Sequence, residues 1–306
     1  PSPEMDLKIL EHWLKDNVNY LSVNVGFDVM SRDETLATLA AYRRWLLAHT
    51  DQFLLAGKLS DIDLARSTGR LAISFDIEGM NALGGDINMV EIYHTLGVRQ
   101  MLFAYNLNNA AAGGCHDADI PLTQFGIEIL AEMNRVGIMV DASHTGYKTS
   151  MDLIDRSGTP VVFSHSNPTS VWQHQRNITD EQIQACAARG GVVGLNGLAI
   201  FAGDNDSSSE TLLRHLFRLI DIAGPAHVGL GFDYTPDVSV DIGSILRARP
   251  DYWPAGQQYD TVNIGHSGPS KIPDLVNGMQ ARGMSEKEIR GILGENFARV
   301  AFESWV

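Results

Sequence analysis

Two histidines end two similar segments of the sequence. Residues 140–144 read Val-Asp-Ala-Ser-His, and residues 161–165 read Val-Val-Phe-Ser-His. Each segment has the β-branched and apolar residues of a buried strand, and polar, turn-forming residues follow it. Parallel strands of a βαβ unit run in the same direction, so His144 and His165 should emerge at the same edge of a sheet. We interpret the pair as part of a metal site; hydrogen-bonded rim histidines are the alternative.

Acidic side chains follow two other predicted strands. Asp76 and Glu78 end a strand that begins at Leu71, and the two-residue period of a strand puts both carboxylates on one face. Either could reach a metal held by the histidines, with a solvated turn as the alternative. Imidazole and carboxylate ligands suit zinc, and an incomplete protein shell leaves room for water. Asp233, after the last strand, could be the general base for that water or cap the next segment.

Further polar residues of the predicted loops could contact a substrate. Arg176 lies between His165 and a helical segment, where a guanidinium could bind a carboxylate bidentately; a surface charge is the alternative. Tyr105 and Asn106 end another strand. The run Cys115-His116-Asp117 suggests a thiol nucleophile, but adjacent residues cannot easily face each other as a catalytic pair. We therefore favour His116 as a loop histidine that contacts substrate or metal.

The elements that must position these residues alternate along the chain. Helical patterns lie between seven predicted strands, at residues 20–25, 71–75, 100–104, 138–141, 161–164, 192–195 and 228–231. Alternation of this kind predicts an α/β fold with a parallel sheet. No Gly-rich dinucleotide turn follows the first strand, so we favour a (β/α)8 TIM-type barrel over a doubly wound open sheet. Seven strands then place the first barrel strand upstream of Pro1.

Local patterns define the predicted helix ends and loops. Ser31 with Glu34 forms a capping-box pattern, and Thr123 is an expected N-cap. We find no repeat or linker and predict a single domain over residues 1–306. Residues 235–270, rich in Pro, Gly, Tyr and Asp, predict a long functional loop after the last strand.

Composition excludes several classes of protein. The net charge of −14 argues against nucleic acid or an anionic membrane as partner. No apolar run approaches the roughly 18 residues of a membrane span. The two cysteines form no disulfide framework, so a cytoplasmic location is the default. The chain begins with Pro1, and a signal segment upstream of it is the alternative.

Together, the motifs resemble the membrane (renal) dipeptidase family of zinc peptidases in the amidohydrolase superfamily. The similarity covers most of the chain from about Leu71. It rests on Asp76-Ile77-Glu78-Gly79, Leu122-Thr123-Gln124-Phe125-Gly126, Met133-Asn134-Arg135-Val136-Gly137, Asp141-Ala142-Ser143-His144, Phe163-Ser164-His165-Ser166, Arg176-Asn177 and Gly229-Leu230-Gly231-Phe232-Asp233.

The resemblance implies a barrel with two zinc ions. Glu78 would bridge the metals, while His144 and His165 would bind the second one. Arg176 would hold the substrate's carboxylate, and Asp233 would serve the proton transfers. A metal-bound hydroxide would attack the amide carbonyl. A homodimer is a further expectation from the family.

Three features depart from the family pattern. The family's first zinc is bound by a His-x-Asp pair, and this pair is absent near the start of this chain. The ligands of the first zinc are therefore not identified in this sequence. Tyr105 stands in the region of a substrate-binding histidine, and a phenol donates a hydrogen bond without imidazolium charge. Asp233 is followed by Tyr234-Thr235-Pro236, unlike the family's Phe-Asp-Gly, and the long loop suggests a reshaped pocket mouth.

We predict a zinc-dependent hydrolase of dipeptides or similar small amides that present a free carboxylate. One alternative is a non-peptidase amidohydrolase acting on another small amide, a lactone or a carbon acid. The other is a non-catalytic relative with an incomplete metal site that acts as a binding protein. Metal content and a panel of dipeptides discriminate among the three.

Overall fold

A parallel sheet forms the centre of the molecule. The computed structural model describes residues 1–234 and 246–305. All strand pairs in it are parallel. The strands are β1 (Tyr20–Phe27), β2 (Phe53–Leu55), β3 (Leu71–Glu78), β4 (Val98–Leu102), β5 (Met139–Asp141), β6 (Val162–Phe163), β7 (Val192–Leu195) and β8 (Val228–Leu230).

The strand order identifies the barrel type of sheet. Neighbours follow the order β1-β3-β4-β5-β6-β7-β8, so the sheet advances in one direction with the chain and ends at β1 and β8. A doubly wound sheet would instead reverse its order at a switch point. The curved parallel sheet is that of a TIM-type barrel, as predicted. The seven predicted strands are all present, although β4 begins two residues earlier than expected.

One strand was not predicted from the sequence. β2 pairs with residues 71–73 of β3, while β4 pairs with residues 75–78 of the same strand. Because β1 occupies the other edge of β3, β2 and β4 share one edge. A segment of three residues is too short to show strand periodicity, so only its pairing with β3 defines it.

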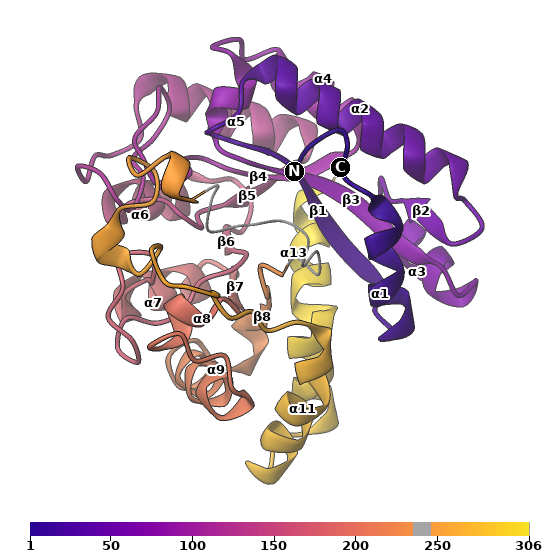
Figure 1. Cartoon of the computed structure of the whole chain (residues 1–306), viewed down its shortest axis with the longest axis vertical. Coiled ribbons are helices and arrows are strands. Elements are labelled where there is room, and N and C mark those ends of the chain that lie inside the picture. Colours follow the sequence, from indigo (N-terminus) through magenta and orange to yellow (C-terminus); the bar gives the residue numbers. More distant parts are fainter. Residues whose placement is uncertain (235–245, 306) are drawn as a thin grey trace.

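Helices cover the outside of the curved sheet, with α2, α4 and α5 along one side and α7 and α9 along another (Figure 1). The expected caps are present: Ser31 and Glu34 form a capping box, and Thr123 caps its helix. Among the helices of the described residues, none has the length and hydrophobicity of a transmembrane segment. The helices before β8 are α1 (Glu11–Lys15), α2 (Arg32–Ala48), α3 (Leu59–Ser67), α4 (Met89–Leu96), α5 (Gln124–Val136), α6 (Tyr147–Arg156), α7 (Asp180–Ala188), α8 (Ala199–Ala202) and α9 (Ser209–Ala223).

The chain after β8 closes one end of the sheet. It forms α11 (Ile272–Ala281), α12 (Glu286–Arg290) and α13 (Asn296–Ser304). In α13, Val300 and Phe297 pack against Met139, Val162 and Val192, the first residues of β5, β6 and β7. This helix therefore covers the amino-terminal ends of the strands. A π-type turn containing Gly294 separates α12 from α13.

The apolar core surrounds the strands, and the polar candidate residues lie at the carboxyl ends of the strands. β3 is buried on both faces, and Leu71, Ile73, Phe75 and Ile77 have no exposed surface. Such continuous burial is typical of parallel strands with a covered sheet on both sides. Part of the predicted long loop, residues 235–245, lies outside the described residues. The described remainder contains the short turns Ala255–Gln257 and Pro269–Lys271.

Candidate metal centre

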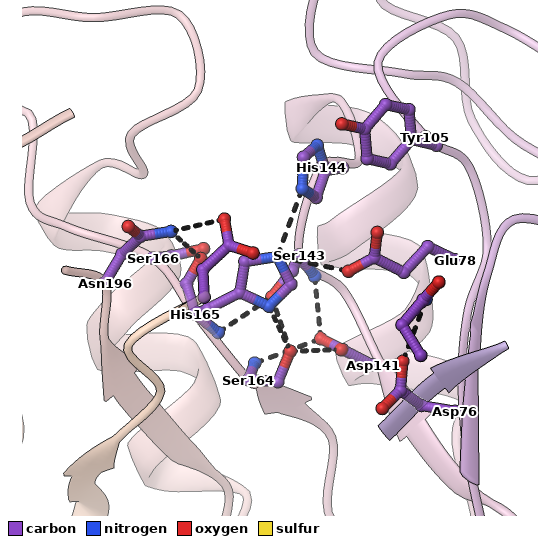
Figure 2. Close-up of polar contacts among 12 residues, drawn as sticks. Asp76, Glu78, Tyr105, Asp141, Ser143, His144, Ser164, His165, Ser166 and Asn196 are labelled. Atoms are coloured by element: carbon purple, nitrogen blue, oxygen red, sulfur yellow. Dashed lines mark hydrogen bonds and ion pairs between the residues drawn. The ribbon is translucent and has the colours of Figure 1, made fainter. Parts of the chain in front are cut away.

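Three potential ligands meet where β3, β5 and β6 end. Glu78 is the last residue of β3, and His144 and His165 follow β5 and β6. Their ligand atoms all lie within 4.8 Å of one another. The two Nε2 atoms are 3.1 Å apart, and Nε2 of His165 is 3.5 Å from Oε1 of Glu78 (Figure 2). Ligands of one tetrahedral zinc lie about 3.3 Å apart, given Zn–N bonds of about 2.0–2.1 Å, so the spacing fits a shared ion.

A hydrogen bond orients the ring of His144. Its Nδ1 lies 2.7 Å from Oδ1 of Asn106, which can only accept, so Nδ1 carries the proton. The lone pair of Nε2 then faces the other two ligands. Asn106 uses its amide Nδ2 to donate to the carbonyl oxygen of Tyr252 at 2.9 Å. The side chain predicted to contact substrate is thus bonded to protein groups at both ends.

A hydroxyl and a carboxylate orient His165. The Nδ1 atom of His165 lies 2.7 Å from Oγ of Ser164, whose hydroxyl donates to Asp141 in a very short hydrogen bond. Gln100 donates to the same Asp141 oxygen from Nε2 at 2.9 Å. Because the Ser164 hydrogen is directed to Asp141, Ser164 accepts the Nδ1 proton of His165. Nε2 of His165 is therefore free for a metal as well.

Charge and burial at the three ligands favour a bound cation. Burial lowers the pKa of His144 well below its ordinary value, and the nearby Arg176 and His165 lower it further. Burial raises the pKa of Glu78 well above its ordinary value, and the charges of Asp233 and Asp76 add to this. Two unprotonated Nε2 atoms 3.1 Å apart repel each other in the absence of a cation between them. Two imidazole nitrogens and a carboxylate oxygen form a donor set that fits zinc.

Asp76, the other candidate carboxylate of β3, has a different environment. It accepts hydrogen bonds from Oγ of Ser22 at 2.5 Å and Nδ2 of Asn24 at 3.0 Å, both on β1. Burial raises its pKa to about 6. Asp76 shares a face with Glu78, but it lies deeper along the strand and is not part of the ligand group.

Arg176 is a buried cation next to the ligands. Only 2% of it is exposed; Nη1 donates to Oγ of Ser166 at 3.1 Å and Nη2 to the backbone oxygen of His165 at 2.8 Å. Its buried Nε has no hydrogen-bond partner, and within the described ranges no carboxylate forms an ion pair with it. A buried charge without a counter-ion is costly, so this guanidinium is suited to an anionic ligand.

Asp233 lies at the mouth of the same site. It is exposed and has a φ of 52°, in the left-handed region. Nδ2 of Asn196 lies 3.4 Å from both Oδ2 of Asp233 and the backbone oxygen of His165. Asn196 thus links the carboxylate to the backbone of His165, one of the three potential ligands. Asn196 follows β7 and has no distinctive local motif, so no sequence pattern indicated it.

Tyr105 and His116 occupy different parts of the rim. The Tyr105 ring stacks on His144, with ring centres 4.2 Å apart. His116 lies outside the ligand group, with Nδ1 2.9 Å from Oε1 of Gln175 and Nε2 2.9 Å from the hydroxyl of Tyr259. Burial lowers the pKa of His116 to about 4. It therefore contributes a neutral ring that joins three loops.

Comparison with known proteins places the chain in a family. The model of the membrane dipeptidase family, peptidase family M19, matches residues 12–246. The chain belongs to the membrane dipeptidase family. An uncharacterised dipeptidase of Schizosaccharomyces pombe is 29% identical over 294 residues, which cover 93% of this chain and 65% of the yeast protein. The chain thus spans less than two thirds of that membrane dipeptidase relative.

Two solved structures share the fold of this member of the membrane dipeptidase family. An amidohydrolase from Pseudomonas aeruginosa has a TM-score of 0.91 and 29% identity, covering 99% of this chain and 94% of its own. A metallopeptidase from Rhodobacter sphaeroides, solved with a phosphinate mimic of the dipeptide L-Ala-D-Ala, has a TM-score of 0.77. It is 23% identical and covers 98% of this chain and 90% of its own, which shows similarity of fold.

Proposed function

We propose that this protein is a zinc-dependent hydrolase of dipeptides, or of similar small amides with a free carboxylate. The observation that carries the proposal is the group of Glu78, His144 and His165, whose ligand atoms lie within 4.8 Å beside the buried Arg176. Such a site joins a metal centre to a receptor for one carboxylate. A peptide bond close to a free carboxylate is the chemical feature that fits both.

Each residue has a separate task in the proposed reaction. Glu78, His144 and His165 would hold the zinc ion, which when bound supplies Lewis acidity and an acidified water. The guanidinium of Arg176 binds the substrate carboxylate and thereby places the amide beside the ligands. The exposed carboxylate of Asp233 accepts the proton of the attacking water and returns it to the leaving amine.

The number of zinc ions is part of the proposal. The family resemblance implies two ions bridged by Glu78, whereas the described residues contain one group of candidate ligands. Elemental analysis of the full-length natural protein distinguishes one ion per chain from two. A value near two supports the binuclear site.

Activity on dipeptides tests the function directly. The zinc-loaded protein is assayed with a panel of L,L- and L,D-dipeptides, alongside His144→Ala and His165→Ala. Both variants are expected to lose bound zinc and turnover together, because each removes one ligand. His12→Ala on α1 is the matched control and should keep both. A folded wild-type protein that binds no metal and hydrolyses no dipeptide would overturn the proposal.

A second candidate function arises from Tyr105. This phenol stacks on His144 at the rim, where the resemblance predicts a substrate-binding histidine. Because the phenol does not carry imidazolium charge, the second candidate is a non-peptidase amidohydrolase acting on another small amide, a lactone or a carbon acid. Turnover of such compounds by the zinc-loaded protein, without turnover of any dipeptide, would favour this alternative.

A further inference from the structure

Residues 252–259, in the described part of the loop after β8, cover the rim of the candidate metal centre with aromatic side chains. Tyr252, Trp253 and Tyr259 are at most 8% exposed although they lie in a loop, and they pack against Ile200 and Phe201. The backbone of Tyr252 also accepts the amide hydrogen bond of Asn106, the residue that orients His144. This loop is therefore directly connected to the residues around the proposed zinc.

Trp253 makes a specific contact with Tyr105. Its indole Nε1 lies 3.2 Å from the Tyr105 hydroxyl oxygen, and the two rings meet edge to face with centres 6.1 Å apart. Phe27 packs against both rings, 5.3 Å from Tyr105 and 6.2 Å from Trp253. Since Tyr105 also stacks on His144, its phenol is held from several sides.

The direction of this hydrogen bond leaves Tyr105 with a free donor. An indole N–H can only donate, so the Tyr105 oxygen must be the acceptor. The hydrogen of the Tyr105 hydroxyl then has no acceptor in the part of the chain that the structure describes. Figure 2 shows the hydroxyl end of the ring on the side of the two histidines. A phenol is protonated near neutral pH, so this hydrogen is available to a ligand.

We propose that Trp253 is a positioning residue that orients the Tyr105 hydroxyl as a hydrogen-bond donor to the carbonyl oxygen of the substrate. The inference rests on the proposed hydrolase function and names two residues that set its rate. Negative charge grows on that oxygen as the amide is attacked, so the donor stabilises the transition state more than the bound substrate. The contribution of Trp253 acts entirely through Tyr105.

Kinetics of two single variants and the double variant test this coupling. Tyr105→Phe removes the donor and should lower kcat about 100-fold, the usual loss for one oxyanion donor. Trp253→Phe keeps an aromatic ring but releases the hydroxyl, and should lower kcat about 10-fold with little change in KM. The double variant should be no slower than Tyr105→Phe alone, because Trp253 has no separate effect.

Trp305→Phe is the matched control. The indole of Trp305 also donates a hydrogen bond of 3.2 Å, to the backbone oxygen of Arg99, and its ring packs near Tyr20 at the start of β1. This position is at the opposite end of the sheet from the metal centre. The same substitution there should leave kcat unchanged.

Independent effects would overturn the inference. If the double variant shows the product of the two single losses, or if Trp253→Phe changes only KM, Trp253 acts by packing and not through Tyr105. Calorimetry with a phosphinate dipeptide mimic gives a second readout, in which both single variants should bind this tetrahedral anion more weakly. If the wild type hydrolyses no dipeptide and binds no mimic, the proposed function fails and this inference fails with it. If the wild type is active, the kinetics of the variants decide whether Trp253 acts through Tyr105.

Discussion

The Nε2 atoms of His144 and His165 lie 3.1 Å apart, and the other nitrogen of each ring is bonded to the protein. Asn106 holds one ring and Ser164 holds the other. The second bonds of these two residues, to Tyr252 and to Asp141, extend the support into the loop after β8 and into the end of β5. Both rings are therefore preorganised with a lone pair toward Glu78, which reduces the entropy lost when a metal binds.

Ser164→Ala should weaken zinc binding without unfolding the protein. The variant removes the acceptor that fixes the Nδ1 proton of His165, and loss of such a support typically costs 10- to 100-fold in metal affinity. Affinity is measured by competition with a chromophoric chelator. Ser150→Ala is the control and should bind zinc normally, because this serine is buried on α6 and its hydroxyl makes two hydrogen bonds away from the metal centre. An unchanged affinity in Ser164→Ala would show that Asp141 and Ser164 do not support the metal site.

Arg176→Met should raise KM for dipeptides with a free carboxylate. Charge-assisted hydrogen bonds are worth about 1.5–3 kcal/mol each, so the expected increase is about 10- to 100-fold. Dipeptide amides lack the carboxylate, and their KM should be high in the wild type and unchanged in the variant. Steady-state kinetics on matched acid and amide substrates give the comparison. Equal increases for both substrates would contradict a carboxylate-binding role.

Gly79→Ala should disrupt the end of β3. A Cβ there would lie 2.1 Å from Cγ of Asp28, and φ at Gly79 is 121°. Overpacking and backbone strain together predict a loss of about 2–4 kcal/mol in the free energy of unfolding. Zinc binding should also be weaker, because Glu78 precedes the glycine. Gly85→Ala is the control: φ is 79° there, but nothing lies within 4 Å of the added Cβ. It should cost only about 1 kcal/mol, measured by urea unfolding. Equal losses of unfolding free energy in the two variants would show that the contact with Asp28 is unimportant.

His215 should make the stability of the fold depend on pH. Burial lowers its pKa to about 4, and its Nε2 donates to the backbone oxygen of Ala202 at 2.8 Å. The unfolded chain, with a histidine pKa of about 6.5, binds more protons between these values. The stability that the neutral, buried His215 contributes to the fold is therefore fully present above about pH 6.5. It decreases as the pH falls toward 4, by roughly 2–3 kcal/mol at pH 4.5. His215→Gln should reduce that decrease in urea unfolding at several pH values. Parallel stability curves for the two proteins would contradict the assignment.

The sequence predicted the features that depend on neighbouring residues. The Ser-His endings, the βα spacing and the caps at Ser31 and Thr123 are local patterns, because strand period and capping depend on a few successive side chains. These patterns were sufficient for the barrel type of sheet. They also indicated that His144 and His165 emerge at one edge, since parallel strands of βαβ units end on the same side.

Only the tertiary structure decided which side chains meet. Asp76 and Glu78 look equivalent along β3, but Ser22 and Asn24 of β1 engage Asp76 and leave Glu78 to the histidines. The tasks of Asn106, Ser164 and Trp253 depend on contacts between distant segments, such as the bond from Trp253 to Tyr105. Such contacts are set by strand register and by how loops pack over the ends of the strands, and neither is encoded in the residues next to each side chain.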